Sequence, residues 1–328
     1  MATSVPDTNT FYLSDVVAVV GGNSLTSCFA NSVDAFFDPA YKGVKDRLSN
    51  FRNYKPYYSD VVKISAVNSN SFTSALNATS LEMSSNGKYM YLLCMGPNSN
   101  TAYLRRYTLT INYDITTLER TYQIYDMSSS IQWDGDTTGV TGLWLAADQR
   151  TMYFTYSHYI CKLIMHTAND LSNIDLFSSN DKSDGTFAGA NIIKDPTDTY
   201  FTMTMSSAGV RNETRTYTNP SGSTLVLSDS QYHDPWDSVG FEWNGTGTSF
   251  FILLTYPPTF SLYKYPVGAN PYRPTGPWGT PVQPTSTFTI PGSIIDVRDF
   301  CFSDNLAYFY ILEFTPEYYP KISQYYLQ

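Results

Sequence analysis

One arrangement of apolar and polar residues recurs five times along the chain. An apolar residue precedes a short polar turn, and a cluster of aromatic and β-branched residues follows the turn. The copies begin at Met83, Leu145, Ile193, Trp243 and Phe302, so successive copies lie 62, 48, 50 and 59 positions apart. A strand–turn–strand unit repeated about every 50 residues is typical of β-propeller blades. The pattern therefore predicts an all-β fold, a five-bladed β-propeller.

Each blade is expected to hold four antiparallel strands. In the first copy, the alternation of apolar and polar residues predicts strands over residues 81–84, 88–94, 102–109 and 122–126. The sequence Ser-Asn-Gly between the first two is a tight-turn signal. Blade three fits the repeat least well, because its third strand has to be taken from residues 213–217.

The last copy of the repeat is one strand short. It ends at Gln328 with three strands, which would leave a sheet edge unpaired. Residues 61–67, just before the first blade, alternate as a strand does. We expect this strand to join the last blade and close the ring, so that residues 58–328 form the propeller.

Residues 1–57 do not fit the repeat and are expected to form a small, partly helical N-terminal anchor. Ser14 or Asp15 can cap one short helix, and a second candidate helix follows Gly21 and Gly22. A segment of this size rarely holds a core of its own, so we expect it to dock onto a partner protein. The expected docking residues are its aromatic ones, some of them buried only in the assembly: Phe29, Phe36, Phe37, Phe51 and Tyr54.

The composition favours a sheet protein and excludes several partners. Aromatic residues make up 16% of the chain, with 28 Tyr and 19 Phe, and these side chains suit pleated, half-buried surfaces. The net charge of −9 disfavours nucleic acid and anionic membranes as partners. The N-terminus lacks the pattern of a signal peptide, and we expect no membrane insertion, because no run approaches the roughly 18 apolar residues that span a bilayer.

The cysteines and histidines give no sign of a cofactor. Cys28, Cys94, Cys161 and Cys301 lie far apart, form no C-x-x-C pair and are expected to be buried thiols, which leaves the redox compartment open. The three histidines have no zinc-ligand spacing, and no nucleotide-binding glycine motif occurs. We therefore expect neither a metal nor a cofactor.

Three segments of residues 1–57 carry a resemblance to a known group of proteins. They are Phe11-Tyr-Leu-Ser-Asp-Val-Val, Asn23-Ser-Leu and Leu48-Ser-Asn-Phe-Arg-Asn-Tyr. Together they resemble a short module in virion proteins of tailed and other phages, and the last resembles proteins of Bacteroidetes, flavobacteria included, and of their phages. The resemblance covers about one sixth of the chain. It implies a structural virion component, such as a spike, fibre or tail-tip protein, present in many copies or as a homo-oligomer and attached to other virion proteins through residues 1–57.

A second candidate site lies in the loops that join each blade to the next, which gather on one face of a propeller. These loops place Trp133, Asp134, Trp236, Asp237, Arg298 and Asp299 on one face. Indoles stack on sugar rings and carboxylates accept sugar hydroxyl protons, so we expect this face to bind a host-surface glycan or receptor. The alternative is that the two indoles pack between blades and the aspartates cap turns.

Two other functions stay open. Five-bladed propellers include glycoside hydrolases, which need a pair of carboxylates. Glu82 and Glu242 occupy equivalent positions just before an apolar lead residue, but no family motif surrounds them. A carbohydrate-active enzyme is therefore the alternative to a binding protein. A purely architectural capsid or tail decoration is the third possibility.

Overall fold

The computed structural model describes most of the propeller strands and part of the N-terminal segment. The described residues are 5–6, 8–20, 22–32, 37, 41, 43–44, 46–52, 54, 64–72, 77–96, 101–131, 140–156, 159–182, 191–194, 200–205, 212–218, 224–233, 238–244, 248–254, 260–267, 274, 282–291, 296–303, 307–316 and 319–327.

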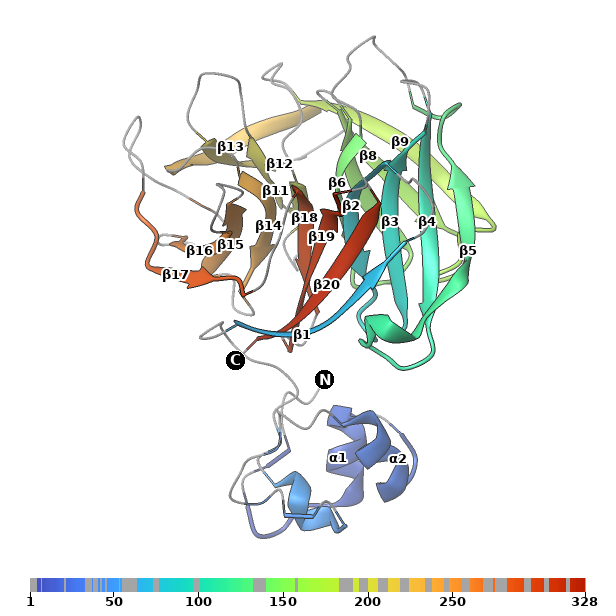
Figure 1. Cartoon of the computed structure of the whole chain (residues 1–328), viewed down its shortest axis with the longest axis vertical. Helices are drawn as coiled ribbons and strands as arrows, with labels where there is room; N and C mark the ends of the chain where they lie inside the picture. The colour runs from blue at the N-terminus through green and yellow to red at the C-terminus, as the bar shows by residue number, and fades with distance from the viewer. Residues whose placement is uncertain are drawn as a thin grey trace.

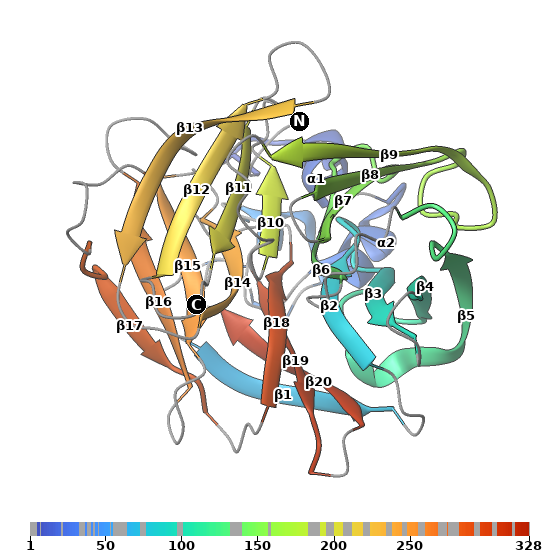
Figure 2. The same cartoon turned by 90° about the horizontal axis from the view of Figure 1, so that it is seen from above.

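The strands form a five-bladed β-propeller, as the repeat predicts (Figures 1 and 2). Blade 1 contains β2 (Asn77–Met83), β3 (Tyr89–Met95), β4 (Ala102–Leu109) and β5 (Leu118–Asp126). Blade 2 contains β6 (Val140–Leu145), β7 (Thr151–Tyr156), β8 (Tyr159–Met165) and β9 (Ile174–Lys182). Blade 3 contains β10 (Asn191–Lys194), β11 (Tyr200–Met205), β12 (Asn212–Thr218) and β13 (Thr224–His233). Blade 4 contains β14 (Ser238–Trp243), β15 (Ser249–Leu254), β16 (Ser261–Pro266) and β17 (Ser286–Thr289).

Blade 5 is built from both ends of the propeller sequence. It contains β18 (Asp296–Phe302), β19 (Tyr308–Phe314) and β20 (Pro320–Leu327), and β1 (Ile64–Ser71) is its outer strand. β1 pairs antiparallel with β20, from Ile64 opposite Leu327 to Ser71 opposite Lys321. The closing strand, expected over residues 61–67, is therefore observed over 64–71, and it ties the first blade's entry to the last blade.

The outer strands of blades 2 and 3 meet, which the sequence did not predict. β13 runs parallel to β9, with Thr224 opposite Asp181 and Leu225 opposite Lys182. The two blades thus share one eight-stranded sheet, and Figure 2 shows the two outer strands converging at the rim. Mutual pairing covers part of two edges that would otherwise be open.

Aromatic rings fill the spaces between blades. Between blades 4 and 5, Phe251, Phe300, Phe302 and Phe309 are all buried, and their ring centroids lie 5.2–5.8 Å apart. Edge-to-face pairs of this kind contribute about 0.5–1.5 kcal/mol each beyond their buried area. The high phenylalanine content is therefore used in packing one blade onto the next.

The four cysteines are buried free thiols. Burial raises the pKa of Cys94 and of Cys161 to about 12. Thiols with raised pKa values are poor nucleophiles, because the thiolate is the reactive form. Their role is packing, as expected from the positions of Cys94, Cys161 and Cys301 in strands.

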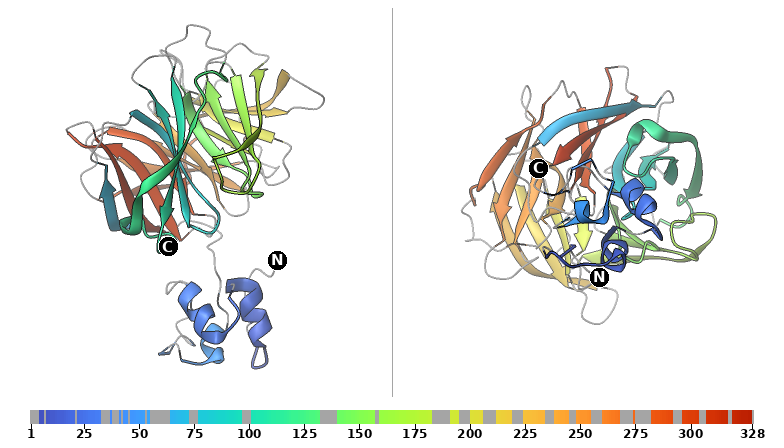
Figure 3. Two further views of the ribbon diagram at one scale, coloured as in Figure 1. Left: turned by 90° about the vertical axis from the view of Figure 1, so that its right-hand side faces the viewer. Right: turned by 90° about the horizontal axis from the view of Figure 1, so that it is seen from below.

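The N-terminal segment folds into a small module with its own core. It contains α1 (Leu13–Val20), α2 (Leu25–Asn31) and the 3₁₀ helix η2 (Leu48–Phe51). Ser24 is the N-cap of α2, and its side chain accepts a hydrogen bond from the Ser27 amide in a capping box. Figure 3 shows the module on one side of the ring, beyond the edges of the blades.

Residues 13–30 are apolar enough to resemble a membrane span, with a mean hydropathy of 1.2 over 18 residues. The backbone divides this stretch into α1 and α2. Gly22, with φ of +99°, lies between them, and a Cβ there would come within 2.6 Å of the Ser27 hydroxyl. A helix that crosses a bilayer needs about 20 residues, and α1 and α2 have 8 and 7.

Candidate functional site: the centre of the ring

Four of the residues proposed to bind glycan, Trp133, Asp134, Trp236 and Asp237, lie outside the described residues. They belong to the loops between β5 and β6 and between β13 and β14. The strands that flank these loops reach the face of the ring opposite the N-terminal module (Figure 1). Both indoles therefore belong to loops that begin and end on the face remote from the module.

Arg298 and Asp299 do not share one surface. Arg298 is exposed, with its Nη2 2.8 Å from Asp296 Oδ2 and its guanidinium carbon 5.1 Å from the Phe314 ring centroid. Asp299 is completely buried. The register between β18 and β19 shifts between Val297 and Asp299, and a bulge of this kind re-aims the side chains beside it. The placement of Asp299 on an exposed glycan-binding face is therefore wrong.

The Asp299 carboxylate binds backbone amides at the centre of the ring. Oδ2 accepts a hydrogen bond from the Leu81 amide of the neighbouring blade at 3.1 Å, and Oδ1 accepts one from its own neighbour, Phe300, at 2.8 Å. Burial raises the pKa of Asp299 well above its usual range, and the two amides oppose this effect. Asp299 thus joins β18 to β2.

Glu82 on β2 and Glu242 on β14 occupy positions equivalent to each other, each just before the lead residue of its copy of the repeat. Glu82 Oε1 accepts from the Met83 amide at 2.8 Å, and Glu242 Oε1 accepts from the Phe302 amide of the next blade at 3.4 Å. Burial, and then the charges of Glu82, Glu242 and Asp299, raise the pKa of the Cys301 thiol. All three carboxylates therefore act on the thiol of Cys301 on β18 through their charge.

These contacts have a common physical cause. The innermost strand of each blade has one edge toward the axis that no described strand pairs with, yet buried amides need an acceptor. Glu242 and Asp299 each supply an oxygen to an amide of the next blade. The carboxylates at the centre therefore stabilise the ring by satisfying strand edges.

The centre of the ring is tightly packed at Asp299. Gly240 on β14 has a φ of +73°, and a Cβ added there would lie 2.2 Å from the Phe300 ring and 3.2 Å from Asp299 Oδ1. A substrate needs a cavity to reach a reacting carboxylate. Asp299 and Phe300 fill the space beside Gly240, and the described residues contain no group of three or more His, Cys, Asp or Glu side chains arranged to hold a metal ion.

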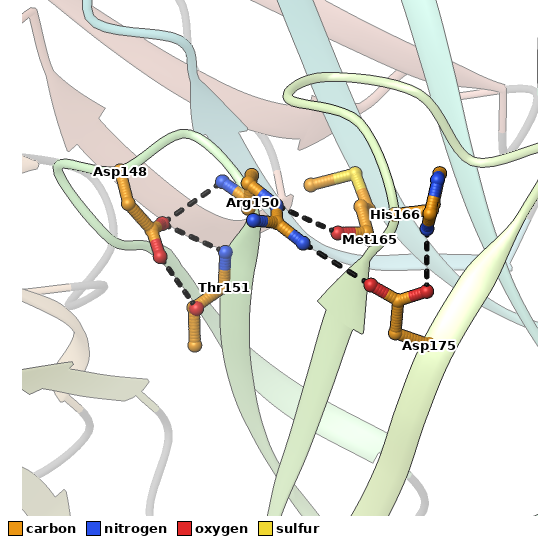
Figure 4. A network of polar contacts seen from close by, with 6 residues as sticks. All are labelled: Asp148, Arg150, Thr151, Met165, His166 and Asp175. Atoms are coloured by element: carbon orange, nitrogen blue, oxygen red, sulfur yellow. Dashed lines mark hydrogen bonds and ion pairs between the residues drawn. The ribbon is translucent and has the colours of Figure 1, made fainter.

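A polar network on blade 2 pairs His166 with a carboxylate (Figure 4). His166 Nδ1 lies 2.8 Å from Asp175 Oδ1, and Arg150 Nη2 lies 3.1 Å from Asp175 Oδ2. Asp148 accepts hydrogen bonds from the amides of Arg150 and Thr151. The network joins two turns, and in the described part of the chain no hydroxyl group is hydrogen-bonded to His166 as a Ser–His–Asp triad would require.

Four of the five aromatic residues proposed for docking lie in or against the core of the N-terminal module. Phe51 and Tyr54 are buried, as is Phe37, while Phe29 is half-buried against Phe51 at 4.6 Å between centroids. The expectation of burial only against a partner is therefore wrong for Phe37, Phe51 and Tyr54, because they bury one another. Phe36 lies outside the described residues.

The module also packs onto the propeller. Ala307 and the partly buried Tyr308, at the turn between β18 and β19, belong to the same cluster as Phe51 and Tyr54. The module therefore contacts the propeller on the face where the turn between β18 and β19 lies. The exposed apolar side chains left on it include Tyr12, 74% exposed, and Val44, 79% exposed.

Comparisons with known proteins add nothing finer to the fold that the strands show. No protein family's sequence profile matches the chain, and no curated protein sequence does. A solved structure of the Carbohydrate-Active Enzymes family AA12 from Trichoderma reesei is 15% identical with a TM-score of 0.49, over 80% of this chain and 85% of that one. A 6-phosphogluconolactonase, so described provisionally, from Bacteroides fragilis is 10% identical with a TM-score of 0.41, over 74% and 81% of the two chains. A protein of unknown function from Desulfotomaculum acetoxidans is 9% identical with a TM-score of 0.41, over 73% and 69%.

Proposed function

We propose that this chain is a structural protein of a virus particle that presents a propeller to the host surface. The N-terminal module attaches the chain to other virion proteins, and the opposite face of the ring binds a host glycan. The observation that carries the proposal is the position of the module, which packs at Ala307 and Tyr308 on one face. The loops that contain Trp133 and Trp236 begin and end on the other face (Figure 1).

The module supports attachment through its surface and not through its core. Its buried rings give it a fixed shape, while Tyr12 and Val44 remain exposed. Protein–protein interfaces bury apolar and aromatic side chains at their centre, and these two are available for such a contact. The virion assignment itself comes from the sequence motifs of residues 11–17, 23–25 and 48–54.

The central carboxylates favour binding over catalysis. A glycoside hydrolase needs one carboxylate to donate a proton and another to attack or to activate water. Asp299 is fully buried and bound to two amides, and Glu82 is 7% exposed and bound to one. Glu242 is the more exposed of the three, so an enzyme alternative would depend on it.

A polysaccharide array tests the glycan proposal. Purified full-length protein is applied to immobilised bacterial surface polysaccharides, beside Trp133→Ala/Trp236→Ala and, as a control, Tyr12→Ala on the module. Stacking contributes about 1 kcal/mol per ring by analogy with aromatic pairs, so we expect weak binding that multivalent display strengthens. The double variant should lose binding and Tyr12→Ala should keep it; equal binding by both variants would contradict a glycan-binding face.

Attachment and catalysis need separate measurements. Val44→Asp and Tyr12→Ala should lower incorporation of the protein into particles without lowering its thermal stability, and normal incorporation would contradict attachment through this surface.

Release of reducing ends from the same polysaccharides, abolished by Glu242→Gln, would support the enzyme alternative. Without binding or cleavage, the architectural role would remain.

A further inference from the structure

Blade 1 has an exposed apolar surface on the outer part of the face that it turns toward blade 5. On β4 and β5, Arg105 lies opposite Ile124 and Tyr107 lies opposite Tyr122, so these four side chains share one face of the sheet. Tyr107 is buried in a cluster that includes side chains of β19 and β20. Tyr122 and Ile124 extend beyond that contact, and each is 46% exposed. The outer part of this face is therefore accessible to a ligand.

Two arginines stack on aromatic rings at this surface. The guanidinium carbon of Arg105 lies 4.6 Å from the centroid of the Tyr122 ring, and that of Arg120 lies 5.5 Å from the centroid of the Phe72 ring. The Tyr107 ring connects the two pairs, because its centroid lies 5.3 Å from that of each of the other rings. Three rings in contact thus carry one guanidinium at each end. We call these five residues the rim patch.

Neither arginine of the rim patch has a carboxylate partner among the described residues. The ion pairs of that part of the chain include neither Arg105 nor Arg120, whereas Arg150 and Arg298 each pair with an aspartate, at 3.1 and 2.8 Å. Arg105 is half-buried, and its Nε is buried without a hydrogen-bond acceptor. A charge that is withdrawn from water without a partner is costly. A bound anion would therefore stabilise Arg105.

Two acidic residues of β5 are close to the rim patch in sequence, and no ion pair of the described residues joins them to it. Glu119 directly precedes Arg120, and Asp126 ends the strand. Asp126 Oδ1 accepts a hydrogen bond from the Ser128 amide at 2.9 Å, and the hydrogen bonds from Ser128 lower the pKa of Asp126. Asp126 is thus a fixed negative charge at the end of the strand. It restricts the surface to ligands whose negative charges lie at the two arginines.

Both guanidinium groups keep N–H donors for an anion. Stacking on a ring uses the flat face of a guanidinium and leaves the five N–H donors at its edge. Arg120 uses Nη2, which donates to Asn70 Oδ1 at 2.9 Å and to the Ser71 carbonyl at 3.0 Å. Burial raises the pKa of Tyr107, and a hydrogen bond with the Arg105 side chain opposes that rise. The remaining donors of each arginine can bind a carboxylate.

We propose that the rim patch binds an acidic saccharide, a chain of sugar rings that carries carboxylate groups. The exposed ring of Tyr122 and the neighbouring Ile124 offer an apolar surface to the face of a sugar ring, and Arg105 and Arg120 bind carboxylates. A nucleic acid fits less well, because it carries a phosphate at every nucleotide and the net charge of −9 repels so dense a charge. The patch consists of strand residues and of Phe72 next to β1, so variants of its own residues test it separately from the loops of the opposite face.

Calorimetric titration of the full-length protein with defined oligosaccharides tests the proposal. The probes are hexamers of galacturonic acid and of sialic acid, and the fully methyl-esterified galacturonic acid hexamer is the uncharged match. The wild type should bind at least one acidic hexamer roughly tenfold or more tightly than the ester, because the ester removes the charge-assisted hydrogen bonds. Failure to bind either acidic hexamer, or equal binding of the ester, would overturn the proposal. Tighter binding of a single-stranded DNA hexamer would instead assign the patch to nucleic acid.

Substitutions locate the binding on the rim patch. Arg105→Gln should weaken binding of the acidic hexamer roughly tenfold or more, Tyr122→Ala should weaken it roughly fivefold, and Tyr122→Phe should keep it because the ring remains. The matched control is Arg150→Gln, an exposed arginine that already pairs with Asp175; it should bind as wild type does. Melting curves report folding, and the exposed Arg120→Gln is a second variant in case Arg105→Gln unfolds. Unchanged binding in the folded arginine variants, or an equal loss in Arg150→Gln, would refute the assignment to this patch.

Discussion

The side chain of Gln324 on β20 is hydrogen-bonded to the backbone at Tyr113 in the first blade. Gln324 Nε2 donates to the Tyr113 carbonyl at 2.6 Å, and Gln324 Oε1 accepts from the Ile115 amide at 3.3 Å. Tyr310 adds a hydroxyl that donates to the same carbonyl at 2.9 Å. The last blade is therefore fastened to the first by side chains as well as by β1.

The same contact recurs between blades 1 and 2. The Tyr91 hydroxyl donates to Asn169 Oδ1 at 2.8 Å, and Arg106 donates to the Asn169 carbonyl. Tyr91 lies opposite Arg106 in its blade as Tyr310 lies opposite Gln324. Tyr113 and Asn169, whose carbonyls accept these hydrogen bonds, both have positive φ values, of 65° and 59°. The repeat thus specifies a joint between blades as well as the blades themselves.

Replacing Gln324 by Leu should weaken the joint between blades 5 and 1. The variant takes the acceptor from the Ile115 amide and one of two donors from the Tyr113 carbonyl, which keeps the Tyr310 hydroxyl; we expect a cost of about 1–3 kcal/mol in the free energy of unfolding. Urea unfolding measures the loss. Tyr319→Phe, which removes a hydroxyl from a residue that is 38% exposed, should change stability little; an equal loss in both variants would contradict a specific joint.

Removing the closing strand should open the ring. A variant lacking residues 1–71 has no β1, so the edge of β20 is exposed and should drive aggregation. A variant lacking residues 1–57 keeps β1 and should stay soluble, although it uncovers Ala307 and Tyr308. Size-exclusion chromatography distinguishes them. A soluble, cooperatively unfolding variant without β1 would show that β20 does not need this partner.

Asp299 should make stability fall as pH rises. Its pKa in the folded state lies above that of the unfolded chain, near 3.9. The folded state therefore binds the proton more tightly, and this contribution is present below the unfolded pKa and lost as pH rises through the folded pKa. Asp299→Asn removes the titrating group, so its unfolding free energy relative to wild type should rise as pH rises above about 4.

Asp148 provides the opposite sign as a control. Burial raises the pKa of Asp148, but hydrogen bonds from the amides of Arg150 and Thr151 and from the Thr151 hydroxyl outweigh it and lower the pKa. Its contribution is present above the unfolded pKa and lost as pH falls. Asp148→Asn should therefore lose most stability, relative to wild type, at neutral pH. The same pH trend in both variants would contradict the assignment for Asp299.

Gly240→Ala should disturb the centre of the ring. The new Cβ would meet the Phe300 ring, and φ of +73° is unfavourable for alanine, so we expect a loss of about 1–3 kcal/mol. Thermal unfolding measures it. Adding Phe300→Leu to the variant should cost less than Phe300→Leu costs in wild type, because the clash is relieved. Strictly additive losses would contradict contact between the two positions.

The sequence by itself determined the blades. Each strand–turn–strand phrase is a local pattern, so the strands predicted over 88–94, 102–109 and 213–217 agree with β3, β4 and β12 to within a residue or two. The closing strand of blade 5 could also be predicted from the alternation before blade 1, because a period of two needs only neighbouring residues. The buried state of Cys94, Cys161 and Cys301 followed from their positions within these strands.

The tertiary structure alone decided which polar groups meet. The sequence predicted Asp299 as a loop carboxylate. A bulge and the close approach of Gly240 instead place it in the packed centre, where it is hydrogen-bonded to Leu81, more than two hundred positions away. Phe51 and Tyr54 looked like docking residues because a short segment seldom encloses a core, but the fold of residues 5–54 brings their rings together. The joint at Gln324 and the pairing of β9 with β13 link different copies of the repeat. Contacts between copies depend on how the blades are arranged around the axis, which no local pattern records.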